Sequence, residues 1–180
     1  MAQVQTITIS GVEYTLSNHW KRLGAGLIDI LVLTIPGVIL GVLAYVAILL
    51  VMIPLVLNAS TFDETNASAS FGPEFFIFIA AVLLISLFVF VINTAIIWAY
   101  EAYWPSKHGG QSPGKKTMGI RVIDEEGYVP TLKIMTIRVL VVTGLNTIIG
   151  ALHYVTIFFT DKRQGLHDMA ARTYVVEGGV

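Results

Sequence analysis

Three long apolar blocks, separated by shorter polar segments, dominate the hydrophobic pattern of the chain. The first block covers residues 23–57 and contains a single charged residue, Asp29. The second block covers residues 75–100 and contains no charged residue. A membrane-spanning helix needs about 20 consecutive apolar residues. Both blocks are long enough to cross a bilayer, so we predict two long transmembrane helices near these positions.

The third block, residues 132–159, does not fit a simple span. Its length of 28 residues exceeds what one crossing needs and is too short for two crossings. Gly144, Asn146 and Gly150 interrupt its middle. We favour a broken helical hairpin that enters and leaves on one side, which is tolerated where the backbone is buried in protein or lines a wet cavity. A plain third span is the alternative.

Short alternating stretches outside the apolar blocks predict a small β element. Residues 4–16 alternate around a central Ser-Gly pair, a pattern typical of a hairpin. Residues 119–124 and 172–176 also look like short strands. If they pair with each other or with the hairpin, the carboxyl-terminal tail must lie on the same side as residues 119–124. That pairing would favour the broken hairpin over a third span.

Composition supports a membrane protein. Hydrophobic residues make up 55% of the chain and charged residues 13%, against about 25% charged in soluble domains, and the mean hydropathy is +0.75. The chain has no cysteine, which excludes disulfides, thiolate metal sites and cysteine nucleophiles. We therefore expect an all-α membrane protein, a single membrane domain over residues 1–180 with the small β element in the cytoplasm.

The distribution of charge predicts the orientation. Basic residues concentrate before the first block, within residues 101–131, and in the tail beyond residue 159. The segment 58–74 contains three acidic residues and no lysine or arginine. Because basic loops stay on the cytoplasmic side, we expect both termini and residues 101–131 in the cytoplasm and the acidic segment outside.

Two charged residues lie inside apolar blocks and need partners. An ionised carboxylate within a membrane helix costs roughly 2.5–3.5 kcal/mol. Asp29 lies six residues past Leu23, and Arg138 lies six residues into the third block, so each is roughly 9 Å inside its block. The matching depth predicts an Asp29–Arg138 ion pair. Such a pair either fixes helix register only or forms part of an ion or proton route.

Two further residues join Asp29 and Arg138 as candidates for ion or proton binding. Asn93 is the only amide of the second block, and a contact between helices is its alternative role. His153 can titrate near neutral pH, and a core histidine with satisfied hydrogen bonds is the alternative.

A second set of charges is expected at the cytoplasmic boundary. Arg22 lies seven residues before Asp29, about 10.5 Å away along one helix face, so the two cannot meet directly. Asp161 and Asp168 are the acids proposed for Arg22, and His167 adds a titratable neighbour. Snorkelling of Arg22 to the membrane interface is the alternative.

Residues 109–117, "GGQSPGKKT", nearly match a phosphate-binding loop. Lys116 occupies the position where such a loop needs Ser or Thr, and Pro113 lacks a backbone N–H. No strand precedes the segment, so we expect no nucleotide to bind there. We expect Lys115 and Lys116 to contact anionic headgroups of the lipid bilayer instead.

Nothing in the sequence favours catalysis. No His/Asp cluster has metal-ligand spacing and no triad-like set is present, so we expect neither an enzyme nor a metal or other cofactor. A net charge of −1 gives no general attraction to nucleic acid.

Three stretches together resemble the RDD family of small bacterial membrane proteins, named for one arginine and two aspartates. "WKRLGAGLID" is similar to the family's opening and places its arginine on Arg22 and its first aspartate on Asp29. "GGQSPGKKTMGIRVID" is similar to its cytoplasmic segment and "DKRQGLHDMAARTYVV" to its closing motif. The second aspartate is Asp161 or Asp168, and we favour Asp168. Arg172 stands where the family commonly has glycine.

The resemblance implies a protein of the bacterial cytoplasmic (inner) membrane. The family has been viewed as transporters of mostly unknown ligands, with monovalent cation/proton antiport proposed for some members. We therefore expect a secondary transporter in which Asp29 binds a cation or proton in alternation and Arg138 is its countercharge. So few helices suggest at least a homodimer. The rival hypothesis is a non-transporting membrane scaffold that binds a partner protein or lipid.

Overall fold

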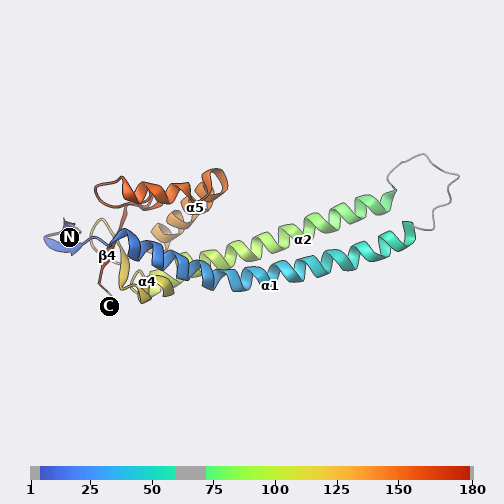
Figure 1. The fold of residues 1–180 in the computed structure, drawn as a ribbon, viewed down its shortest axis with the longest axis horizontal. Helices are drawn as coiled ribbons and strands as arrows, with labels where there is room; N and C mark the ends of the chain where they lie inside the picture. Colours follow the sequence, from blue (N-terminus) through green and yellow to red (C-terminus); the bar gives the residue numbers. More distant parts are fainter. Residues whose placement is uncertain (1–4, 60–71, 179–180) are drawn as a thin grey trace. The chain divides into compact units, whose positions relative to one another are not determined.

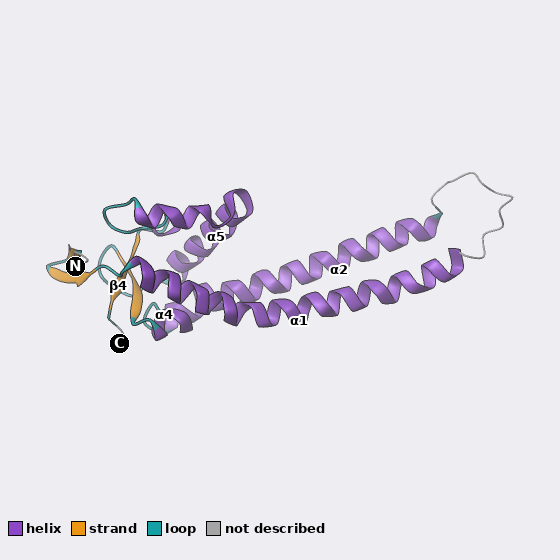
Figure 2. Cartoon of the chain, viewed as in Figure 1, coloured by secondary structure: helices purple, strands orange, loops and turns teal. Residues whose placement is uncertain are grey.

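The computed structural model describes residues 5–59 and 72–178, so most of the acidic segment 58–74 lies outside the described residues. The described part is mostly helical, with short antiparallel strands (Figures 1 and 2). In chain order the elements are β1 (Thr6–Ile9), β2 (Val12–Thr15), α1 (His19–Ala59), α2 (Pro73–Trp98), the π-helix η2 (Ala99–Tyr103), α3 (Trp104–Lys107), α4 (Pro113–Thr117), β3 (Ile120–Asp124), α5 (Leu132–Ile149), the 3₁₀ helix η3 (Gly150–Phe158), α6 (Leu166–Ala170) and β4 (Thr173–Glu177).

Three helical stretches are long and apolar enough to cross a membrane. They are His19–Pro54, Phe75–Lys107 and Leu132–Ile149. This finding confirms the predicted class of an all-α membrane protein. The first stretch begins before the predicted block at residue 23, because the polar residues ahead of that block form the first turn of α1. The second runs past residue 100, because η2 and α3 continue α2.

The chain divides into two compact units, which are described separately. The hairpin unit is Thr34–Ala95, and the charged unit consists of Met1–Leu33 with Ile96–Val180. In the hairpin unit, a cavity of about 340 Å³ is lined by Gly37, Leu40, Gly41, Ala44, Ser86, Val89, Phe90 and Asn93. Small residues on one helix beside an amide on another are typical of helix packing in membranes.

The third apolar block breaks at one residue. Gly144 and Asn146 lie within α5, whereas Gly150 adopts φ 58° and ψ −145° and ends that helix. Figure 1 shows the chain turning back after α5, and the returning segment η3 contacts α5. At the end of η3, the Phe158 ring stacks on the His19 ring at 4.8 Å between centroids. The block therefore returns to the beginning of α1, as the broken hairpin requires.

Two small antiparallel sheets belong to the charged unit. Strands β1 and β2 form the expected hairpin, with φ of 49° at Ser10 and 81° at Gly11. Both values are positive, as the type I′ turn of a two-residue hairpin requires. Strand β3 pairs with β4, and Leu16 forms a bridge to Val176. The tail is thus held beside residues 119–124.

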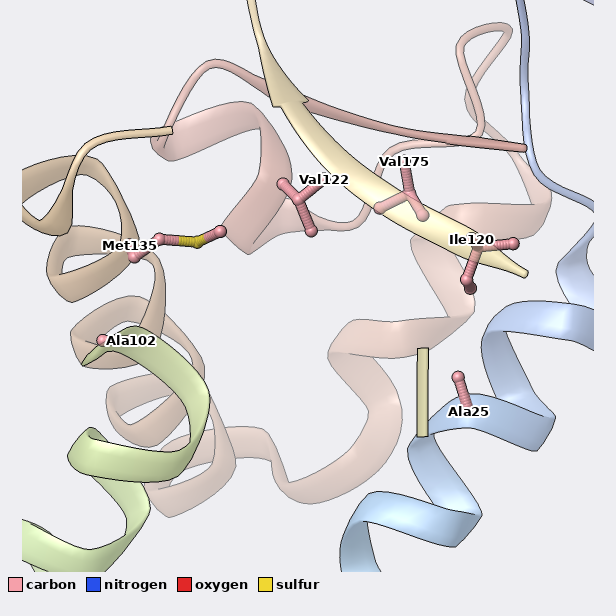
Figure 3. Packing of buried hydrophobic residues seen from close by; sticks show 6 residues of the cluster. All are labelled: Ala25, Ala102, Ile120, Val122, Met135 and Val175. Carbon is pink, nitrogen blue, oxygen red and sulfur yellow. The ribbon is translucent and has the colours of Figure 1, made fainter. Parts of the chain in front are cut away.

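A buried apolar cluster positions the site. It contains Ala25, Ala102, Ile120, Val122, Met135 and Val175, which come from α1, η2, β3, α5 and β4 (Figure 3). Each of these side chains is at most 2% exposed. Because Ala25 is in this cluster, the residue four positions later on α1, Asp29, lies on the same inward face.

Candidate functional site

Asp29 lies in a complete cage of hydrogen-bond donors. The residue is 3% exposed. Its Oδ1 accepts hydrogen bonds from the Gly114 N–H at 2.8 Å and the Tyr100 hydroxyl at 2.7 Å. Its Oδ2 accepts one from the Ser112 hydroxyl at 2.6 Å. A buried polar group is tolerated when it is hydrogen-bonded, and these donors from η2 and residues 109–117 allow the carboxylate to stay inside.

The phosphate-loop-like segment supplies two of these donors. Ser112 caps α4, and Pro113 occupies the first turn, where no N–H is needed. A side chain at position 114 would collide with the Ala25 carbonyl oxygen and lie 2.6 Å from Asp29 Oδ1, so Gly114 is required for this approach. N–H groups at the start of a helical turn favour an anion. The anion bound here is the carboxylate of Asp29.

An ammonium group sits among oxygens beside this cage. Lys115 Nζ lies 3.1 Å from Ser112 Oγ, 3.3 Å from Glu101 Oε2 and 3.8 Å from Asp29 Oδ2. The π-helix η2 carries both Tyr100 and Glu101 toward this point, and π-helical turns are frequent at functional sites. We call Asp29, Tyr100, Glu101, Ser112 and Lys115 the Asp29 cluster. Its two carboxylates and one ammonium give it a net charge of −1.

Asp168 is the centre of a second cluster. It lies on α6 and is fully buried. Its Oδ2 lies 2.9 Å from Arg22 Nη1 and accepts a hydrogen bond from the Gly165 N–H at 3.1 Å. Its Oδ1 lies 2.6 Å from Arg138 Nη2 and 3.4 Å from His167 Nε2. We call Arg22, Arg138, His167 and Asp168 the Asp168 cluster; it joins α1, α5 and α6.

The Arg22 guanidinium uses all three nitrogens. Besides Asp168, its Nε donates to Ser17 Oγ at 2.7 Å and its Nη2 to the Val175 carbonyl at 3.3 Å. Because Ser17 and Val175 are also buried, the planar guanidinium fixes β4 and the segment before α1 to the cluster.

The surroundings of Asp168 keep it ionised. Burial by itself would raise its pKa, but Arg138, His167, Arg22 and the Gly165 N–H act in the opposite direction. The net result is a pKa well below the ordinary value of 3.8. Two guanidiniums around one carboxylate leave an excess of +1, without counting His167. This excess balances the −1 of the Asp29 cluster.

The predicted ion pair between Asp29 and Arg138 is wrong. Asp29 faces Ser112, Gly114 and Lys115, whereas Arg138 contacts Asp168. Equal depth along two helices does not fix the direction in which each side chain points, and the prediction left out the donors of residues 109–117. The countercharge beside Asp29 is therefore Lys115.

The structure places the other predicted residues in different surroundings. Of the two acids proposed for Arg22, Asp168 is its partner and Asp161 is exposed. His167 is buried beside Asp168, with its ring edge-on to Tyr154 at 5.6 Å between centroids.

The structure describes the two remaining ion-binding candidates to different extents. Asn93 belongs to the hairpin unit and lines the cavity there. The backbone of His153 lies in η3, and its side chain is outside the described part of the structure. The two lysines expected to contact lipid headgroups have different surroundings. Lys115 is half-buried in the Asp29 cluster, whereas Lys116 is exposed.

Sequence reasoning missed Tyr100, Glu101, Ser112 and Ser17 as site residues. One signal pointed to Ser112, because the Gly-rich spacing of residues 109–117 is typical of backbone that approaches an anion. Tyr100 and Glu101 lie among the aromatic residues at the end of the second apolar block. Such residues are typical of a membrane interface, so their pattern did not indicate a site. Within the described residues, no group of three or more His, Cys, Asp or Glu could hold a metal ion.

Comparison with known proteins gives one match. The family model described as "RDD family" matches residues 16–172, which is most of the chain. The matched region includes both charge clusters. Neither the curated proteins nor the solved structures contain a match to the chain.

Proposed function

The chain belongs to the RDD family, and we propose that it is a secondary transporter that exchanges a monovalent cation for a proton at the Asp29 cluster. The observation that carries this proposal is the position of Lys115 Nζ, within 3.8 Å of three oxygens from Asp29, Glu101 and Ser112. The ammonium group of Lys115 carries one positive charge and is surrounded by oxygens, so a monovalent cation could bind the same oxygens in its place. The same carboxylates would serve both occupants.

The exchange balances in charge. With Lys115 protonated, the Asp29 cluster carries −1. A cation that binds the oxygens of Asp29, Glu101 and Ser112 adds one positive charge, and loss of the Lys115 proton to water removes one. The cluster returns to −1, so one cation exchanges for one proton. Asp29 is the fixed anion in this scheme and Lys115 carries the exchanged proton, a role that the sequence alone assigned to Asp29.

The Asp168 cluster is proposed as the gate beside this site. Arg22 and Asp168 join α1 to α6, and Arg138 extends the connection to α5. A movement of the broken hairpin that separates Arg138 from Asp168 would leave charges buried without a partner, which is costly. This cost would hold the gate closed until binding at the Asp29 cluster offsets it.

Orientation and assembly are part of the same proposal. The basic residues before the first span and between residues 101 and 131 favour a cytoplasmic position for both termini, in the bacterial inner membrane. Lys116 is exposed, which supports its proposed contact with anionic headgroups. Two long helices and one broken hairpin are few for a pathway, so we propose a homodimer or higher oligomer. We propose transport without an enzymatic reaction, nucleotide or nucleic acid.

One observation favours the rival function of a membrane scaffold. The charges of the two clusters sum to zero without His167, and the Asp29 and Arg22 side chains have hydrogen-bond partners at every charged atom. Such a closed network can serve as a static anchor that fixes helix register. Transport and anchoring predict different results in the same assay.

The assay uses purified protein in liposomes that contain a pH-sensitive dye. Transport predicts proton movement when a sodium or potassium gradient is applied, and a static anchor predicts none. Lys115→Met removes the exchanged proton, so cation-driven proton movement should disappear. Lys116→Met, at the exposed neighbouring lysine, is the matched control and should retain it.

Cation binding to the same variants gives a second readout. Without its tethered ammonium, the Lys115→Met site should bind sodium or potassium about tenfold more tightly or better. Two charges 4 Å apart interact by about 4 kcal/mol at an effective dielectric constant of 20, and tenfold needs only about 1.4 kcal/mol. Unchanged proton coupling in a folded Lys115→Met protein would remove Lys115 from the mechanism.

A further inference from the structure

A further cavity, in the charged unit, is lined by none of the residues of the two charge clusters. Its volume is about 180 Å³, and it is lined by Gln5, His19, Phe158, Phe159, Thr160, Asp161 and Arg163. It lies between the first residue of α1 and the end of η3, where the His19 ring stacks on Phe158. The volume is smaller than the 300–1,000 Å³ typical of drug-sized ligands, so the cavity suits a small polar group.

The lining offers two opposite charges beside neutral hydrogen-bonding groups. The Arg163 guanidinium donates from Nη1 to the Ser17 carbonyl at 3.3 Å, and a planar guanidinium of this kind also matches the oxygens of a phosphate. The Asp161 carboxylate is suited to an ammonium. These two charges cancel, which favours a zwitterion over a simple anion. His19, Gln5 and Thr160 add polar atoms between them.

The cavity lies where two apolar segments end. The membrane-compatible part of α1 begins at His19, and the third apolar block ends at residue 159. Phe159, which lines the cavity, is 83% exposed, and Trp20, the residue after His19, is 72% exposed. Exposed aromatic rings at the end of an apolar helix are typical of the membrane–water interface. These features favour a position of the cavity at the depth of lipid headgroups.

We propose that this cavity binds the headgroup of a zwitterionic phospholipid with a primary amine, as in phosphatidylethanolamine. The phosphate lies against Arg163 and the ammonium against Asp161, while the acyl chains pass over Phe159 and Trp20. A primary ammonium fits better than a quaternary one, because its N–H groups can donate to Asp161, Thr160 and Gln5. The site is independent of the cation exchange proposed above.

The test measures lipid bound to the full-length protein in detergent micelles by native mass spectrometry. Phosphatidylethanolamine, phosphatidylcholine and phosphatidylglycerol with identical acyl chains are added in turn. Preferential retention of phosphatidylethanolamine is expected. Asp161→Asn and Arg163→Gln should each lower its apparent affinity by about tenfold, the order expected for one charge-assisted contact. Lys162→Gln is the control. It removes the cation that lies between these two residues in the sequence and contacts Tyr174, and it should leave the apparent affinity unchanged.

The remaining outcomes each contradict the proposal. Equal retention of the three lipids would show that the headgroup is not recognised. Full retention of phosphatidylethanolamine by the Asp161→Asn protein would exclude this cavity as the binding site. Because Asp161 is exposed, this substitution should preserve folding. Soluble glycerophosphoethanolamine is added as a competitor, and displacement of the lipid at equal concentration would identify a free phosphorylated amine as the ligand instead.

Discussion

The Arg138 guanidinium lies 2.6 Å from the Asp168 carboxylate, on the opposite oxygen from Arg22. One fully buried aspartate therefore holds two arginines from two different helices. The carboxylate neutralises only one of them, so each arginine depends on Asp168 for its place inside the protein. Removing one member of a buried ion pair leaves the other charge uncompensated, which typically costs 3–5 kcal/mol.

Asp168→Asn should therefore be strongly destabilising. The amide keeps the shape of the side chain but leaves Arg22 and Arg138 facing each other without an anion. We expect the free energy of unfolding to fall by about 3–5 kcal/mol, measured by denaturant unfolding in detergent micelles. Asp161→Asn is the control and should change it by no more than about 0.5 kcal/mol, because Asp161 is exposed. Equal effects at both positions would contradict the assignment.

The lowered pKa of Asp168 predicts how stability depends on pH. In the unfolded chain the group has its ordinary pKa of 3.8, and in the folded protein its pKa is lower. Above the ordinary value both states are ionised and the full stabilisation is present. As the pH falls below it, the unfolded state takes up a proton first, so stability is progressively lost toward the lower pKa of the folded state.

Denaturant unfolding measured from neutral pH to about pH 3 checks this sign. The difference in unfolding free energy between the native protein and Asp168→Asn should narrow as the pH falls below about 4. A difference that grows as the pH falls would mean that folding raises the pKa of this carboxyl group.

Gly114→Ala should open the Asp29 cage. The new methyl group would meet the Ala25 carbonyl and Asp29 Oδ1, and neither can move without shifting α1. We expect a loss of about 1–3 kcal/mol, the usual range for overpacking, together with loss of cation-driven proton movement. Gly26→Ala, on α1, is the control, because a Cβ at that position has no neighbour within 4 Å. A Gly114→Ala protein with native stability and activity would contradict the close approach.

Arg22→Lys should fail to replace the native side chain. A lysine ammonium cannot reproduce the fork that reaches Ser17, Asp168 and Val175 at once. We expect the free energy of unfolding to fall by about 1.5–3 kcal/mol, the range for hydrogen bonds to charged groups. Lys21→Arg, beside it in the exposed ion pair with Glu177, should be nearly neutral. Native stability of Arg22→Lys would show that a single point charge suffices.

The parts of the fold that follow from periodicity were predictable. Apolar length predicted the helices, and alternation predicted the strands, of which β3 and β4 pair and hold the tail beside residues 119–124. The break in the third block was located less well. An interior glycine such as Gly144 costs a helix about 1 kcal/mol and is tolerated. Gly150 adopts a positive φ that only glycine reaches easily, and the sequence does not distinguish the two.

The partners of the charged residues were only partly predictable. Asp161 and Asp168 were both proposed as partners of Arg22, and tertiary structure selects Asp168. The three hydrogen-bond donors to Asp29 escaped prediction because they are a backbone N–H and two hydroxyls, which carry no charge to match. The position of a residue along a helix specifies its depth in the membrane, whereas tertiary packing decides which neighbour its side chain faces.

The most direct test of the central claim is proton movement driven by a sodium or potassium gradient in liposomes that contain the Asp29→Asn protein. The variant must first show native stability of the fold in thermal unfolding, and Asp161→Asn liposomes serve as the reference. The account predicts that Asp29→Asn abolishes the movement while the reference retains it. Undiminished movement through a folded Asp29→Asn protein would contradict the account.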